Sequence, residues 1–169
     1  MGQEIERKFL LKGDDWRTLV TGTTLLRQGY LSTDPRREVR VRTTDDTEAF
    51  LTVKAKQVGP ARAEFEYAIP VEDAQELLTH RTGGLVEKHR HHLTTPAAGQ
   101  WIVDEYIGAH TGLIVLEIEW EHAEDTSLVL PPWVGTDVTG NPAYSNATLA
   151  SAAKARTAPT APTEQLGTP

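Results

Sequence analysis

Pairs of acidic residues separated by one position occur near residue 5 and again near residue 118. Glu4 and Glu6 form the first pair, and Glu117 and Glu119 form the second. In an extended strand, residues two apart point to the same side and lie about 6.6–6.8 Å from each other. Carboxylate oxygens are hard ligands of the kind that Mg²⁺ and Mn²⁺ prefer. Two such pairs on facing walls could hold one divalent ion between them, or two ions side by side.

Basic side chains show the same spacing elsewhere in the sequence. An arginine guanidinium binds phosphate oxygens in a bidentate manner, and a lysine supplies a compact positive charge. A set of such residues on strand faces therefore favours a polyanionic ligand such as a linear polyphosphate. The basic residues with this placement are Lys8, Arg40, Arg42, Lys54, Arg62, Lys88 and Arg90, and the acidic residues Glu64, Glu66 and Asp104 occupy the same kind of face.

A simpler interpretation is that these charges face solvent and pair across neighbouring strands. Such pairs are common, and each contributes about 0.2–1 kcal/mol to stability. This interpretation suits any single strand, but it fits poorly when most of the strands carry charge doublets of one sign. We therefore expect the charged faces to line the interior of a wide barrel, where bound metal and polyanion compensate the buried charges.

Alternation of apolar and polar residues with a period of two defines the strands that position these charges. Three helical segments are also expected: a short one from Asp14 to about Val20, one over Val71–His80, and one over about 145–155. The sequence thus predicts a mainly β (α+β) fold, in which about eight short antiparallel strands form a closed or nearly closed barrel with a few flanking helices. The strands are expected at residues 3–11, 25–31, 37–43, 49–57, 61–69, 85–93, 100–107 and 114–121.

Composition excludes several classes of protein. The 169 residues carry a net charge of −7 and no cysteine, which disfavours a duplex nucleic-acid binder and excludes disulfides and thiolate metal sites. No apolar run suits a signal peptide or a membrane span, so we expect a cytoplasmic protein. Residues 1–155 are expected to form one domain, and the Thr-, Pro- and Ala-rich residues 156–169 to be disordered. Both a monomer and a homodimer remain open.

The ordered charged strands resemble a known family. Glu4-Ile5-Glu6-Arg7-Lys8 is similar to the ExExK signature of the CYTH superfamily, the triphosphate tunnel metalloenzymes. The resemblance covers about residues 1–150 and is closest to short bacterial-type inorganic triphosphatases. The further matching segments, in chain order, are Gln28–Leu31, Arg40–Arg42, Thr52–Lys54, Arg62–Tyr67, Lys88–Arg90, Val103–Tyr106, Gly112–Leu113, Glu117–Glu119, Val138–Thr139 and Tyr144–Leu149.

This resemblance implies an eight-stranded antiparallel closed barrel with a charged tunnel. It also implies hydrolysis of inorganic triphosphate to pyrophosphate and phosphate inside that tunnel, dependent on Mg²⁺ or Mn²⁺. It implies that Lys88 positions or deprotonates the attacking water. Neighbouring cations are expected to lower the pKa of Lys88 and so favour that role. The implied metal ligands are Glu4, Glu6, Glu117 and Glu119, with Asp104 and Glu64 assisting. The implied substrate-binding residues are Lys8, Tyr30, Arg40, Arg42, Lys54, Arg62 and Arg90.

Other functions stay open at this point. Within the same family they are a nucleoside or thiamine triphosphatase and an adenylate cyclase. Outside it, a non-catalytic polyphosphate-binding module would keep the cations but would not need the acidic pairs. The histidine-rich segment His89–His92 lacks the spacing of a common zinc motif, which favours packing at the barrel rim over metal ligation. Trp101 and Trp120 fall off the charged face and are expected in the core.

Overall fold

The computed structural model describes residues 5–34, 36–55, 63–95, 97–120 and 129–157. Two α-helices lie in these ranges, α1 (Val71–Thr79) and α2 (Asn146–Thr157), together with the 3₁₀ helices η1 (Asp15–Leu19), η2 (Gly108–His110) and η4 (Pro142–Tyr144). The strands are β1 (Ile5–Leu11), β2 (Val20–Ser32), β3 (Arg37–Thr44), β4 (Glu48–Ala55), β5 (Glu64–Ala68), β6 (Thr82–Leu93), β7 (Gln100–Ile107), β8 (Ile114–Trp120) and β9 (Val134–Asp137).

All eight predicted strands and all three predicted helical segments are present. The helix after Asp14 is a 3₁₀ helix, and α2 continues two residues beyond its expected end, to Thr157. The rest of the tail that was predicted to be disordered lies outside the described residues. None of the described helices is long and apolar enough to cross a membrane.

The strands form one nine-stranded antiparallel sheet in the order β5-β4-β3-β2-β6-β7-β8-β1-β9. In the part of the chain that the structure describes, the edge strands β5 and β9 do not pair, so the predicted closed eight-stranded barrel is not confirmed. The physical reason lies at β1, whose second edge pairs with β9 through Phe9 with Asp137 and Leu11 with Val134. A strand of only four residues is too short to show alternation in the sequence, and β9 was not predicted.

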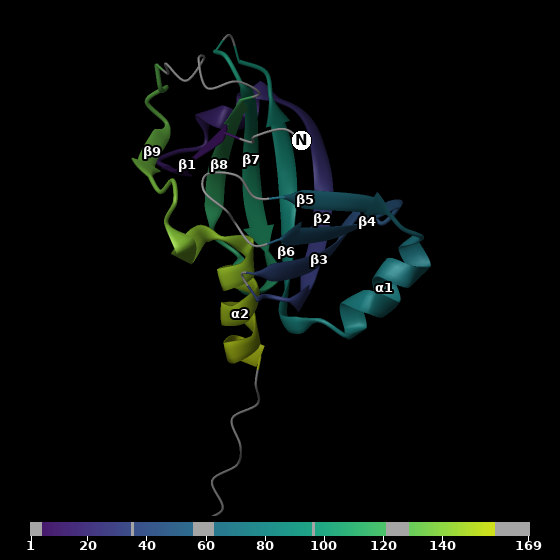
Figure 1. The fold of residues 1–169 in the computed structure, drawn as a ribbon. Coiled ribbons are helices and arrows are strands. Elements are labelled where there is room, and N and C mark those ends of the chain that lie inside the picture. The colour runs from purple at the N-terminus through teal and green to yellow at the C-terminus, as the bar shows by residue number, and fades with distance from the viewer. Residues whose placement is uncertain (1–4, 35, 56–62, 96, 121–128, 158–169) are drawn as a thin grey trace, which may run out of the picture.

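The sheet is strongly twisted. Figure 1 shows β3, β4 and β5 running across the direction of β6, β7 and β8, as the right-handed twist of long strands produces. The long strands β2 and β6 join these two halves through a register that runs from Val20–Leu93 to Tyr30–Thr82. One face of each half therefore turns toward the other.

Apolar side chains occupy the opposite face of the sheet. Trp101 and Trp120 are buried there, as predicted, and Trp101 meets Trp133 edge to face with ring centroids 6.0 Å apart. Trp16 of η1 is fully buried in the same cluster. Helix α1 covers a second cluster around Val41 and Ala74. Packing on the apolar face therefore stabilises the sheet, and the opposite face is free to carry charged side chains.

Gly83 of β6 allows helix α2 to pack closely against that strand. Gly83 has a φ of +82°, and a Cβ at this position would lie 2.9 Å from the carbonyl oxygen of Ala150 in α2. Leu149 and Ala150 are buried in a cluster with Tyr106 and Val86. Close approach of the two backbones thus fixes the helix on the sheet.

We expect Gly83→Ala to lower the free energy of unfolding by about 2–4 kcal/mol, because backbone strain and overpacking add at this position. Gly112→Ala is the matched control: its φ is also positive, at +96°, but no atom lies within 4 Å of the added Cβ. It should cost about 1 kcal/mol from strain alone. Urea denaturation followed by circular dichroism measures both, and equal losses would contradict the tight packing of α2.

Candidate active site

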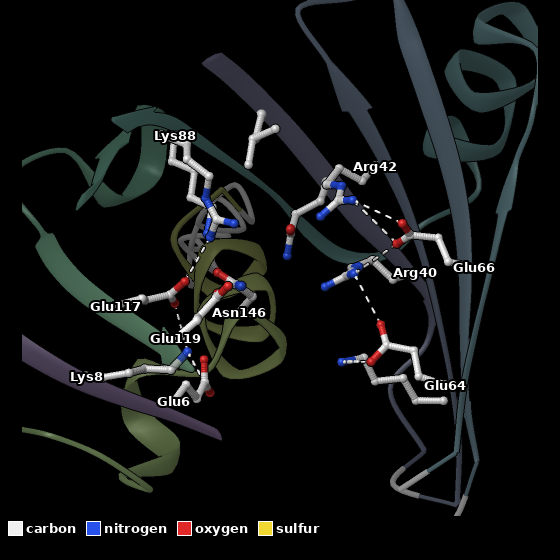
Figure 2. A pocket seen from close by; sticks show the side chains of 14 residues that line it. Glu6, Lys8, Arg40, Arg42, Glu64, Glu66, Lys88, Glu117, Glu119 and Asn146 are labelled. Atoms are coloured by element: carbon white, nitrogen blue, oxygen red, sulfur yellow. Dashed lines mark hydrogen bonds and ion pairs between the residues drawn. The ribbon is translucent and has the colours of Figure 1, made fainter. Parts of the chain in front are cut away.

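A cavity of about 300 Å³ lies between the two halves of the sheet, and 11 of the 14 side chains that line it are charged. Figure 2 shows two groups of these side chains pointing toward each other across an open space. Strands β1, β6 and β8 supply one group, which we call the carboxylate wall, and β3, β4 and β5 supply the other, the arginine wall. The lining residues are Glu6, Lys8, Leu26, Gln28, Arg40, Arg42, Lys54, Glu64, Glu66, Lys88, Arg90, Glu117, Glu119 and Asn146.

Antiparallel pairing of β1 with β8 brings Glu6 of the first predicted acidic pair next to the second pair. Lys8 lies opposite Glu117, and Glu6 lies opposite Glu119. Carboxylate oxygens of Glu6, Glu117 and Glu119 lie within 4.8 Å of one another. This all-oxygen set fits a hard divalent cation such as Mg²⁺ or Mn²⁺. Glu4, the remaining member of the predicted set, lies outside the described residues.

The ammonium group of Lys8 lies within this acidic cluster. Its Nζ is 2.8 Å from Glu117 Oε1 and 3.3 Å from Glu6 Oε1. Burial lowers the pKa of Lys8, but Glu117 and Glu6 outweigh burial and raise it above its usual value. The lysine is therefore charged, and it shares carboxylates with any metal ion that binds there.

A buried carboxylate, that of Asp104, binds both Lys88 and Arg90. Asp104 is fully buried, forms an ion pair with Lys88, and accepts hydrogen bonds of 2.8 Å from Nε and Nη2 of Arg90. Arg90 Nη2 also lies 2.8 Å from Glu117 Oε2, which links this network to the acidic cluster. Asp104 does not line the cavity, so it lies behind the position expected of an assisting metal ligand.

Burial has different consequences for the members of this network. It lowers the pKa of Lys88, Arg90 lowers it further, and Asp104 only partly opposes them. The sequence argument expected the direction of this shift but attributed it to neighbouring cations. Burial raises the pKa of Asp104, yet Lys88 and Arg90 outweigh it and hold that pKa well below its usual range.

The arginine wall carries looser ion pairs. Lys54 Nζ lies 2.9 Å from Glu64 Oε2, whereas Arg42 Nη2 lies 3.4 Å from Glu66. Arg40 Nη2 is 3.8 Å from Glu66 and 3.9 Å from Glu64. The Nε atoms of both arginines are buried without a hydrogen-bond partner among the described residues. These donors can therefore turn toward an anion in the cavity.

Some predicted site residues are not in the cavity lining. Tyr30 is buried behind it, and its hydroxyl accepts a hydrogen bond of 3.3 Å from Nε2 of Gln28, which does line the cavity. Burial raises the pKa of Tyr30 to about 12. Arg62 lies outside the described residues.

Three lining residues were not predicted: Leu26, Gln28 and Asn146. Leu26 and Gln28 share the face of Tyr30 on β2, so alternation could have found both. Asn146 belongs to a helix, where alternation of strand residues gives no signal.

The histidine-rich segment contributes packing on the outer side of β6. His91 Nδ1 lies 2.9 Å from Thr23 Oγ1, and its Nε2 lies 3.2 Å from Glu105 Oε2. Its ring lies 5.2 Å from that of Trp16 between centroids. Among the described residues, the one cluster of three metal-ligating side chains is the acidic cluster in the cavity, and no histidine belongs to it.

Comparison with known proteins agrees with this geometry. The sequence profile of the CYTH domain matches residues 2–138. The chain belongs to the CYTH family. The resemblance inferred from the ordered charged strands is thereby confirmed.

Named relatives share most of the length of this CYTH chain. An inorganic triphosphatase from Acetivibrio thermocellus is 41% identical over 150 residues, which cover 88% of this chain and 94% of the relative. An inorganic triphosphatase from Nitrosomonas europaea is 35% identical over 153 residues, covering 87% and 96%. A crystal structure of an inorganic triphosphatase superposes with a TM-score of 0.66 at 34% identity, covering 89% of this chain and 96% of that one.

We expect Asp104→Asn to lower the free energy of unfolding by about 3–5 kcal/mol at pH 7, because it leaves the buried charge of Lys88 uncompensated. The pKa of Lys88 is already below its unfolded value, so the native state of the variant sheds this proton as pH rises. The deficit should therefore shrink between pH 7 and pH 10. Urea denaturation at both pH values measures this change.

Asp137→Asn is the matched control for this measurement. Asp137 pairs with Arg7 at 2.6 Å, but its side chain is 43% exposed. Its loss should cost less than about 1 kcal/mol at either pH. A deficit for Asp104→Asn that is equally small, or that grows with pH, would show that Lys88 does not depend on Asp104 for its charge.

Proposed function

We propose that this protein hydrolyses inorganic triphosphate, with water, to pyrophosphate and phosphate. The observation that supports this most strongly is the arrangement of one cavity, where a cluster of three carboxylates faces Arg40, Arg42 and Lys54 of the arginine wall. The similarity to inorganic triphosphatases over nearly the whole chain adds support. This chemistry needs facing walls rather than a hydrogen-bonded closed barrel, so the open sheet is compatible with it.

The proposed metal ligands are Glu6, Glu117 and Glu119, together with Glu4. Glu64 of the arginine wall is a further candidate, whereas both oxygens of Asp104 already accept hydrogen bonds from Lys88 or Arg90. A bound Mg²⁺ or Mn²⁺ would neutralise phosphate oxygens and promote deprotonation of water. The carboxylates hold that charge beside the substrate.

The proposed substrate ligands come from both walls. Arg40 and Arg42 have buried donors without a partner among the described residues, and Lys54 lies beside them in the lining. Lys8 and Arg90 approach from the carboxylate wall, and Arg62 is proposed from the sequence alone. These cations stabilise charge on the transferred phosphoryl group and on the leaving pyrophosphate. Tyr30, buried behind Gln28, contributes by holding that side chain.

Lys88 is the proposed catalytic residue. Its side chain lines the cavity although it is almost fully buried, and burial lowers its pKa. A lysine with a lowered pKa can accept a proton from the attacking water, which an arginine cannot do, and it can also orient that water. Asp104 fixes its position. We place this reaction in a single domain formed by residues 1–155, in the cytoplasm.

Phosphate release from inorganic triphosphate should require added Mg²⁺ or Mn²⁺ and stop in excess chelator. Glu6→Gln should keep the fold but reduce kcat/KM by about 100-fold or more, because an amide is a poorer metal ligand. Glu76→Gln on the exposed face of α1 is the matched control and should retain full activity. Hydrolysis of pyrophosphate, ATP and thiamine triphosphate is measured in parallel, because the alternative activities would favour one of these substrates. A higher kcat/KM for any of them than for inorganic triphosphate would overturn the proposal.

Lys88→Ala should reduce kcat by about 10²- to 10⁴-fold with little change in KM, as loss of a general base requires. Arg90→Ala should raise KM as well, because it removes a phosphate ligand. Steady-state kinetics distinguish the two, and thermal melting verifies that both variants fold. Lys88→Arg decides the role, since it keeps the charge but cannot accept a proton. Near wild-type kcat in this variant would exclude proton transfer by Lys88.

A further inference from the structure

One residue of the cavity lining comes from a helix, whereas the other 13 come from strands. Asn146 is the first residue of α2, and Figure 2 shows it in front of that helix, in the space between the two walls. Its side chain is neutral among 11 charged ones. A primary amide can present either a hydrogen-bond acceptor, which suits a metal ion, or a donor, which suits an anion. Its orientation therefore decides which ligand it serves.

Tyr106 fixes that orientation. The Tyr106 hydroxyl donates a hydrogen bond of 2.9 Å to Oδ1 of Asn146. Tyr106 is 2% exposed and packs in the apolar cluster with Leu149 and Ala150, so its hydroxyl is held at this position. With Oδ1 engaged, the amide nitrogen of Asn146 is left as a donor, and no partner for it is found among the described residues. Asn146 is thus arranged for an anion.

The backbone around Asn146 is also held in place. Ser145 Oγ accepts a hydrogen bond of 3.2 Å from the amide of Thr148 and caps the helix. His110 Nε2 lies 2.9 Å from the carbonyl oxygen of Leu149. The packing of Gly83 against Ala150 leaves no room for the helix to shift toward β6. Little conformational freedom remains to be lost when Asn146 binds a ligand.

We propose that the amide nitrogen of Asn146 donates a hydrogen bond to a phosphate oxygen of bound triphosphate, and that Tyr106 is the positioning residue that aims it. This assignment rests on the proposed function. It gives the substrate a neutral donor from α2 in addition to the cations of the two walls. It also explains why the buried Tyr106 hydroxyl points toward the first residue of α2 rather than into the apolar cluster that surrounds the ring.

Steady-state hydrolysis of inorganic triphosphate with Mg²⁺ tests the role of Asn146. Asn146→Ala should raise KM about tenfold with kcat within about twofold, as expected for a lost hydrogen bond to a charged group. Asn146→Asp has the same shape, but it places a carboxylate oxygen where the donor was. It should raise KM by more than Asn146→Ala does, because that oxygen repels phosphate. Asn141→Ala makes the same change outside the cavity, in an exposed side chain, and should leave KM unchanged.

Tyr106→Phe tests the positioning role, because the ring stays and only the hydroxyl is lost. It should raise KM severalfold in the wild-type background but have no further effect in Asn146→Ala, since Tyr106 acts through that side chain. Equal effects in both backgrounds would overturn the positioning role. Unchanged KM in both Asn146 variants would overturn the role of Asn146.

Thermal melting with triphosphate and Mg²⁺ separates failure of this inference from failure of the proposed function. The wild type should melt at a higher temperature with both ligands present, and Asn146→Ala should show a smaller shift. If the wild type binds but does not hydrolyse triphosphate, the proposed function fails while the shifts still test Asn146. If the wild type neither binds nor hydrolyses triphosphate, both proposals fail.

Discussion

Compensation of charge within one small cavity is the constraint on which the rest of the structure depends. Eleven charged side chains line about 300 Å³, and isolated charges at such depth would be strongly destabilising. The fold meets this requirement by setting carboxylates opposite cations, as in the pairing of Lys8 with Glu117 and of Lys54 with Glu64. Under the proposed function, a metal ion and a triphosphate bring opposite charges, so together they can replace these internal partners and preserve the balance. Either ligand alone disturbs it, which couples the binding of one to the binding of the other.

The two walls differ in how firmly their charges are held. Behind the carboxylate wall, Asp104 has no exposed surface and both Arg90 contacts with it measure 2.8 Å. In the arginine wall, the carboxylate of Glu66 is 37% exposed and its contacts with Arg40 and Arg42 measure 3.4–3.8 Å. The first arrangement suits a site that positions a water molecule and a metal ion. The second leaves the arginine side chains able to follow phosphate oxygens in the proposed reaction.

Much of this arrangement could be predicted because charge alternates with apolar residues along each strand. Alternation reveals which face a side chain occupies, and antiparallel pairing then brings one group of predicted residues into a single cavity: Glu6, Lys8, Arg40, Arg42, Lys54, Glu64, Glu66, Lys88, Arg90, Glu117 and Glu119. It does not reveal depth, so Asp104 and Tyr30 shared the correct face but lie behind the lining. Nor does it reveal sheet closure or β9, since the partner of an edge strand depends on contacts distant in sequence. Asn146 was missed because its position depends on the packing of a helix.

Pairing of β1 with strands near the other end of the chain has a consequence for how the protein folds. The contact of Lys8 with Glu117 spans 109 residues, and that of Lys8 with Thr139 spans 131. Contacts this distant in sequence close large loops and form slowly, whereas the hairpins from β2 to β4 involve only neighbouring segments. During synthesis, β1 stays unpaired until nearly the whole domain has left the ribosome, because its partners β8 and β9 are made late. The acidic cluster is therefore among the last parts of the protein to assemble, and a nascent or truncated chain lacks the proposed metal site.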